Sequence, residues 1–196
     1  MSRMTWLIMS VVVGCAATAS AQQASCGPLT VYDRVMPITI TEAEKHGIEE
    51  LVVIRYVPGD TSRDREYRII ISESIGGKIV ATRYDPVQRS VREQLREAEA
   101  RQPNATCDSL LAEISIAEHR FENQSLLRRV LKDFSTVRIP ARLPASIYLD
   151  ASRFEVIHWA KMNESRFTVY SAADTANNQL IGWVKRVNAR LGVHDQ

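Results

Sequence analysis

The sequence predicts an α+β fold in which an antiparallel sheet of hairpins packs against about three helices. Three observations lead to this class. Runs of β-branched residues end at turn-forming residues, two pairs of these runs have hairpin spacing, and three segments repeat apolar residues at helical spacing. We expect the order of elements to be approximately β-β-β-α, then β-α, then β-β-β-α.

The first elements are expected to form most of the sheet. Gly76-Gly77 suits a two-residue hairpin turn, because both turn residues need a positive φ. The predicted elements are a strand Leu29–Arg34, a helical turn from Thr41 to Gly47, a strand Ile48–Val57, and a hairpin of Glu66–Ile75 with Lys78–Tyr84. The turn sets Glu73 opposite Val80, so the predicted core face carries Tyr67, Ile69, Ile71, Val80 and Tyr84.

The second half alternates helices with further strands. Pro86 suits the first turn of a helix to about Arg101, in which Val87, Val91, Leu95 and Ala98 form a narrow apolar stripe. The later predicted elements are a strand from about Ala112 to Phe121, a helix Ser125–Thr136, a strand Ser146–Leu149, a hairpin of Arg153–Lys161 with Arg166–Ser171 around Asn163-Glu164, and a helix Asn177–Leu191.

Residues 1–21 have the features of a secretory signal peptide. Arg3 is their only charge, an apolar run extends from Trp6 to Ala17, and Ala19-Ser20-Ala21 has the small residues that a signal peptidase reads. The run is shorter than the roughly 20 apolar residues of a membrane-spanning helix. We therefore expect cleavage between Ala21 and Gln22, and one globular domain over residues 22–196.

Cys15 leaves a second interpretation of this segment open. Val12-Val13-Gly14-Cys15 resembles the site at which bacterial lipoproteins are acylated on cysteine. The expected location is therefore periplasmic or secreted, and the alternative is a lipoprotein that contacts the membrane only through Cys15.

Two cysteines remain outside the signal segment. An even pair in an oxidising compartment predicts a disulfide between Cys26 and Cys107. The chain has no Cys-x-x-Cys and no Cys/His spacing of a zinc site, so we expect neither a metal nor a cofactor.

The charge of the chain argues against two classes of partner. The formal net charge is +2 at pH 7, and the two signs are interspersed. Nucleic-acid binding proteins carry a basic patch or stripe, and membrane-surface helices carry a basic amphipathic face. We expect no nucleic-acid partner.

His158 is a weak candidate for a catalytic group. It alternates with Phe154 and Val156 on the expected apolar face of the second hairpin, and a titratable ring on such a face can mark a site. Asp150 and Glu155 lie near it in sequence and could supply a carboxylate. The structural alternative is a partly buried ring that hydrogen-bonds a nearby carbonyl, with Asp150 in a polar turn.

Trp159 and Tyr170 are expected on the opposite face of the same hairpin. If no helix covers that face, they form an exposed aromatic patch of the kind that binds partners. If the sheet is covered on both sides, they belong to the interior.

The sequence has neither a G-x-S-x-G nor an H-E-x-x-H motif. It therefore favours a non-enzymatic, exported binding or interaction domain of the cell envelope, whose partner is another envelope or secreted protein. The alternatives are a secreted hydrolase with a site near His158, and a lipid-anchored envelope protein through Cys15.

Overall fold

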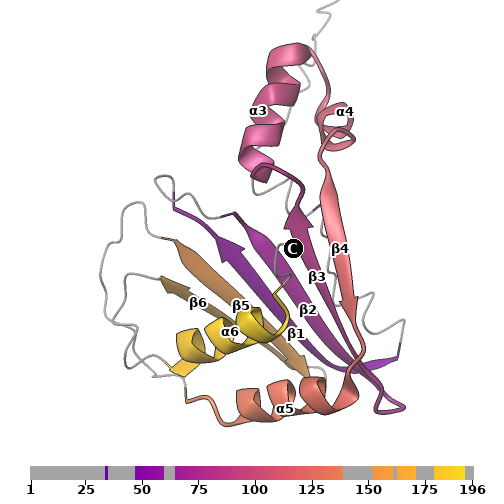
Figure 1. Cartoon of the computed structure of the whole chain (residues 1–196), viewed down its shortest axis with the longest axis vertical. Helices are drawn as coiled ribbons and strands as arrows, with labels where there is room; N and C mark the ends of the chain where they lie inside the picture. Colours follow the sequence, from indigo (N-terminus) through magenta and orange to yellow (C-terminus); the bar gives the residue numbers. More distant parts are fainter. Residues whose placement is uncertain are drawn as a thin grey trace, which may run out of the picture.

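The computed structural model describes Arg34 and residues 47–59, 65–138, 152–160, 163–170 and 179–192. These residues form a six-stranded antiparallel sheet and four helices, which confirms the predicted α+β class (Figure 1). The strand order is β4-β3-β2-β1-β5-β6. The strands are β1 (Ile48–Val57), β2 (Tyr67–Ser74), β3 (Ile79–Pro86), β4 (Ile116–Phe121), β5 (Arg153–Ala160) and β6 (Asn163–Tyr170). The helices are α3 (Val91–Arg101), α4 (Cys107–Leu111), α5 (Gln124–Ser135) and α6 (Gln179–Arg190).

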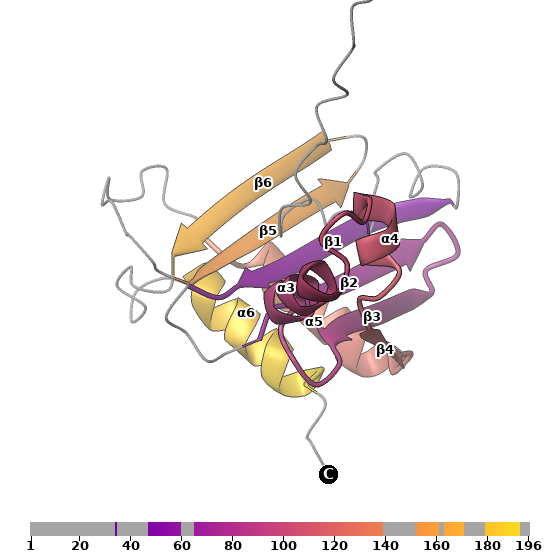
Figure 2. The same ribbon diagram turned by 90° about the horizontal axis from the view of Figure 1, so that it is seen from above.

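Helices α5 and α6 lie side by side on one face of the sheet, and this face holds the main core (Figures 1 and 2). Alternate residues of β1, β2 and β5 point toward the two helices, because successive strand side chains point to opposite faces. The indole Nε1 of Trp183, in α6, donates a hydrogen bond of 3.1 Å to the carbonyl of Val130 in α5. The buried residues include Val52, Ile54, Ile69, Ile71, Val156, Leu127, Val130, Leu180, Trp183, Val184 and Leu191.

The opposite face of the sheet is also buried at its centre. Leu51, Val53 and Trp159 form a second cluster, with exposures of 2%, 4% and 6%. Strand β1 therefore has apolar neighbours on both sides, which explains its continuous apolar run.

Helices α3 and α4 have a small core of their own beyond one end of the sheet (Figure 1). Val91, Leu95 and Ala98 of α3 pack against Leu110 and Ile114, so the predicted stripe of α3 is confirmed from Val91 onward. A buried carboxylate next to β2 joins the pair of helices α3 and α4 to the sheet. Glu66 is only 1% exposed, and its Oε1 accepts a hydrogen bond from the backbone N–H of Val91 at the start of α3.

The predicted two-residue turn between β2 and β3 is wrong. The loop holds three residues, Ile75-Gly76-Gly77, and Ser74 N–H donates to Lys78 O at 3.0 Å. Only Gly77 has a positive φ, 71°, as in a hairpin whose last loop residue is left-handed. Glu73 therefore pairs with Ile79 instead of Val80.

This extra residue turns the side chains of β3 to the other face of the sheet. Ile79, Ala81 and Arg83 share the face of Ile71, whereas Val80 and Tyr84 lie on the opposite face. The predicted core face is thus correct for β2 and wrong for β3.

The predicted helix start at Pro86 is also wrong. Pro86 is the last residue of β3, and α3 begins at Val91 after the N-cap Ser90. The hydroxyl of Ser90 and the carboxylate of Glu93 form a capping box, which is a stronger start signal than proline alone.

Two further boundaries differ from the predictions. The segment before β4 is the helix α4, so this strand begins at Ile116 instead of Ala112. Ala160 pairs with Asn163, so β5 and β6 are joined by residues 161–162 and not around Asn163-Glu164.

Several predictions lie outside the described residues. These are the signal segment 1–21, residues 29–33 of the strand Leu29–Arg34, the helical turn from Thr41 up to Gly47, and the strand Ser146–Leu149. Arg34 is described and is helical, so the predicted strand is wrong at that residue. Cys107 is bonded in a disulfide whose partner lies outside the described ranges, so the pairing with Cys26 stays a prediction.

We predict that Glu66→Ala lowers the free energy of unfolding by about 1–2 kcal/mol, because the first N–H of α3 loses its buried acceptor. Denaturant unfolding measures this loss, and amide exchange should locate it in the first turn of α3. Glu66→Gln keeps an acceptor oxygen and serves as the control. An equal loss in both variants would contradict the capping role.

We predict that Ser90→Ala raises the pKa of Glu93. The side-chain and backbone hydrogen bonds from Ser90 hold this pKa below its ordinary value. Because the pKa is depressed in the folded state, ionised Glu93 stabilises α3 at neutral pH, and this contribution is lost as the pH falls through the folded-state pKa. NMR titration of the carboxyl carbon measures the shift. Ser90→Thr keeps the hydroxyl and should leave the pKa low.

Candidate functional site

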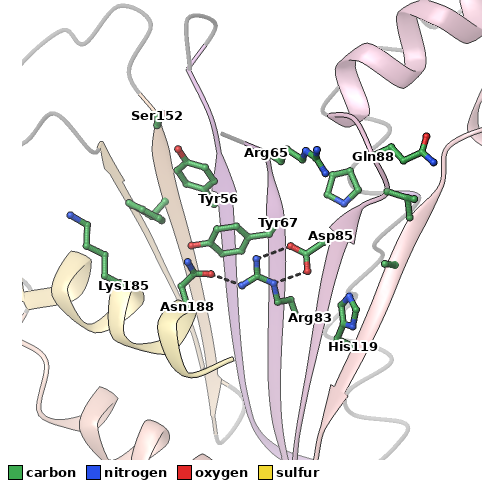
Figure 3. A pocket seen from close by; sticks show the side chains of 14 residues that line it. Tyr56, Arg65, Tyr67, Arg83, Asp85, Gln88, His119, Ser152, Lys185 and Asn188 are labelled. Atoms are coloured by element: carbon green, nitrogen blue, oxygen red, sulfur yellow. Dashed lines mark hydrogen bonds and ion pairs between the residues drawn. The ribbon is translucent and has the colours of Figure 1, made fainter. Parts of the chain in front are cut away.

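A pocket of about 900 Å³ opens on the face of the sheet that carries α6, toward the end near α3 (Figure 3). Side chains from five neighbouring strands form its floor, α6 forms one wall, and the segment that precedes α3 forms another. The floor residues are Phe154 of β5, Tyr56 of β1, Tyr67 of β2, Arg83 and Asp85 of β3, and Ala117 and His119 of β4. The remaining lining residues are Arg65, Pro86, Val87, Gln88, Ser152, Lys185 and Asn188.

Strand register brings three aromatic rings together on this floor. Tyr56 pairs across the sheet with Tyr67 on one side and Phe154 on the other. The ring centroids of Tyr56 and Tyr67 are 5.3 Å apart in a stacked arrangement, and those of Tyr56 and Phe154 are 5.0 Å apart. The result is a row of packed aromatic rings across β5, β1 and β2, none of them more than 9% exposed.

Arg83 continues this row as a fixed cation. Its Nε and Nη2 donate to the two carboxylate oxygens of Asp85 at 2.6 and 2.7 Å, and its Nη1 donates to Oδ1 of Asn188 in α6 (Figure 3). The guanidinium carbon lies 4.6 Å from the ring centroid of Tyr67. Arg83 thus ties β3 to α6 and holds the floor in one conformation.

The lining carries more positive than negative charge. Arg65, Arg83 and Lys185 are cations, and Asp85 is the one carboxylate among the described lining residues. Arg83 and Asp85 neutralise one another, so the excess charge comes from Arg65 and Lys185, both of which are exposed. Lys185 and His119 make no hydrogen bond or ion pair with another described residue, so both remain available to a ligand.

His158 does not line this pocket. It lies on the predicted apolar face and pairs with Ser165 of β6. Its Nε2 is 2.9 Å from Oε1 of Glu50, and its ring meets Phe134 edge-on at 5.0 Å. The half-buried imidazole of His158 therefore has a hydrogen-bond partner, a carboxylate on the neighbouring strand β1.

Of the two predicted carboxylate partners of His158, only Glu155 belongs to the described residues, and it does not lie beside the ring. Asp150 lies outside the described residues, and Glu155 lies on the opposite face of the sheet. Glu155 there accepts a hydrogen bond of 3.2 Å from Arg55. On this face, Arg55 pairs across the sheet with Arg68, and Arg68 pairs with Tyr84. The pKa of Tyr84 is raised chiefly by burial and also by the negative charge of Glu118.

Trp159 and Tyr170 share a face, as predicted, but differ in exposure. Trp159 is 6% exposed and packs with Leu51 and Val53, whereas Tyr170 is 36% exposed. The two side chains therefore do not form an exposed aromatic patch, and the alternative of a sheet covered on both sides holds at Trp159.

The pocket residues were not among the sequence-based candidates. The wrong hairpin register put Tyr84 in place of Arg83 on the inner face. The signal that could have identified the site is the alternation of β3 itself, since Ile79 and Ala81 are followed at the same spacing by Arg83 and Asp85. A charged pair at inward positions indicates that the apolar core ends there.

Comparison of the chain with protein-family models, curated proteins and solved structures finds no match. Within the described ranges, no group of three or more His, Cys, Asp or Glu side chains could hold a metal ion. No helix in the same part of the chain is long and apolar enough to cross a membrane.

We predict that Arg83→Met lowers the free energy of unfolding by about 1–3 kcal/mol, because Asp85 is left without its partner at a mostly buried position. The double variant Arg83→Met, Asp85→Asn removes the stranded charge and should recover part of this loss. Chemical denaturation of both variants measures the difference. A double variant less stable than the single one would show that Asp85 has another role.

Proposed function

We propose that this chain is a non-enzymatic binding domain for a small organic anion with a flat apolar part. The observation that carries the proposal is the continuity of an aromatic row with a cationic rim inside one pocket. Ligand sites are typically concave, mostly apolar, and orient the ligand through a few polar groups. The pocket combines an aromatic floor with a larger share of polar and charged groups, and Arg83 ties this floor to α6.

The two parts of the pocket suit two parts of such a ligand. Tyr56 and Phe154 line the floor, each 7% exposed, and can contact the apolar part of a ligand there. Lys185 on one side of the pocket and Arg65 on the other can each attract a carboxylate, sulfonate or phosphate group (Figure 3). The same two cations would repel a cationic ligand. We therefore expect the pocket to bind anions in preference to neutral or cationic molecules.

The lining supports binding better than catalysis. General acid–base chemistry needs a base that is oriented by a second group and free to take a proton. Asp85 is already held in a bidentate pair with Arg83, and His119 has no orienting partner among the described residues. The proposed hydrolase site near His158 finds no support here, since the His158–Glu50 pair does not line the pocket.

Export remains part of this proposal and rests on the signal features of residues 1–21. Cleavage at Ala21–Gln22 would release the domain, and acylation of Cys15 would anchor it. In either case, the proposed partner is a small organic anion and no longer another envelope or secreted protein.

We predict that naphthalene-2-sulfonate binds the wild-type protein at least tenfold more tightly than neutral 2-naphthol or the 2-naphthylmethylammonium cation. All three probes have the same ring system and differ in charge. Isothermal titration calorimetry measures their affinities, and the sulfonate affinity should fall as salt is raised.

Lys185→Ala should weaken sulfonate binding about three- to tenfold, because one attractive charge at the rim is lost. Lys132→Ala removes another exposed lysine, from α5 and outside the pocket lining, and should leave the affinity unchanged. Equal binding of the three probes, or equal effects of the two lysine variants, would refute the proposal.

A further inference from the structure

Gln88 has an unusual backbone conformation at the rim of the pocket. Its φ is 63°, and among the described residues it is the one non-glycine residue with a positive φ. Side chains with a Cβ rarely adopt this region, and such residues concentrate at functional sites. Gln88 lines the pocket between the end of β3 and the start of α3.

The side chain of Gln94, in α3, holds this conformation in place. Its Nε2 donates to the carbonyls of Val87 at 3.2 Å and Arg89 at 2.9 Å, on either side of Gln88. Its Oε1 accepts from the backbone N–H of Ser115 at 2.8 Å. The backbone on both sides of Gln88 is thus fixed to the segment before β4, and the strained conformation is stabilised from outside.

These hydrogen bonds leave the side chain of Gln88 free. It is exposed and forms no hydrogen bond with another described residue. Its neighbour Val87 also lines the pocket, and its apolar side chain is 38% exposed. A strained polar residue and an exposed apolar residue therefore lie together at one rim.

We propose that Val87 and Gln88 form the specificity-determining rim of the pocket, where the amide of Gln88 hydrogen-bonds a polar group on the ligand. Gln88 and Lys185 lie on opposite sides of the pocket (Figure 3). With its acid at Lys185, the ligand is an aromatic anion with a second hydrogen-bonding group at the end far from that acid. This inference rests on the proposed binding of an organic anion.

The test compares naphthalene-2-sulfonate with 6-hydroxynaphthalene-2-sulfonate, which adds a hydroxyl at the end of the ring system away from the acid. The wild-type protein should bind the hydroxylated probe about three- to tenfold more tightly, as expected for one net hydrogen bond. Gln88→Ala and Gln88→Gly should lose this preference and keep the affinity for the unsubstituted probe.

A second pair of measurements tests the strain and the role of Gln94. Gln88→Gly should unfold at a higher denaturant midpoint than Gln88→Ala, because glycine adopts a positive φ without steric cost. Gln94→Ala should reduce the preference for the hydroxylated probe although Gln88 is unchanged, since Gln94 acts as a positioning residue.

The outcomes separate this inference from the proposed function. If neither sulfonate binds the wild-type protein, both fail. If both probes bind equally, or if the preference survives in Gln88→Ala and Gln88→Gly, only the role of Gln88 is overturned.

Discussion

The antiparallel pairing of β1 with both β2 and β5 is the constraint on which the rest of the structure depends. Strand β1 lies in the middle of the sheet and is buried on both faces, with Val52 under the helices and Leu51 on the opposite side. A slip of one residue against either neighbour would exchange these two faces. The same register brings Tyr56 between Tyr67 and Phe154, so the core and the pocket floor are set by one pairing.

The pocket exists because α5 and α6 cover only part of the face against which they pack. Along β3 the inward positions pass from Ile79 and Ala81, under the helices, to Arg83 and Asp85, where cover ends. Polar groups at such positions need partners because they are largely withdrawn from water. The bidentate pair, the amide of Asn188 and the ring of Tyr67 supply them, and the open floor is thereby ordered.

The sequence predicted elements whose signals are local. Strand β1 was predicted at its observed bounds, and α5 and α6 within a few residues of theirs, because periodicity and flanking residues define them. The site was not predicted, since its residues come from five strands and their alignment depends on the turn at Gly77. His158 was placed on the correct face, but its partner Glu50 is more than one hundred residues away in sequence. No local pattern specifies such a pairing.

The separate small core of α3 and α4 affects which substitutions the protein can accept during evolution. One side of the pocket is attached to this unit, whereas the floor belongs to the main core. Substitutions that lengthen or tilt α3 would reshape the rim near Gln88 while the packing of α5 and α6 on the sheet stayed as it is. In the proposed binding function, the ligand contacts at this rim and the packing of the main core depend on different residues, so changes at the rim would not need compensating core mutations.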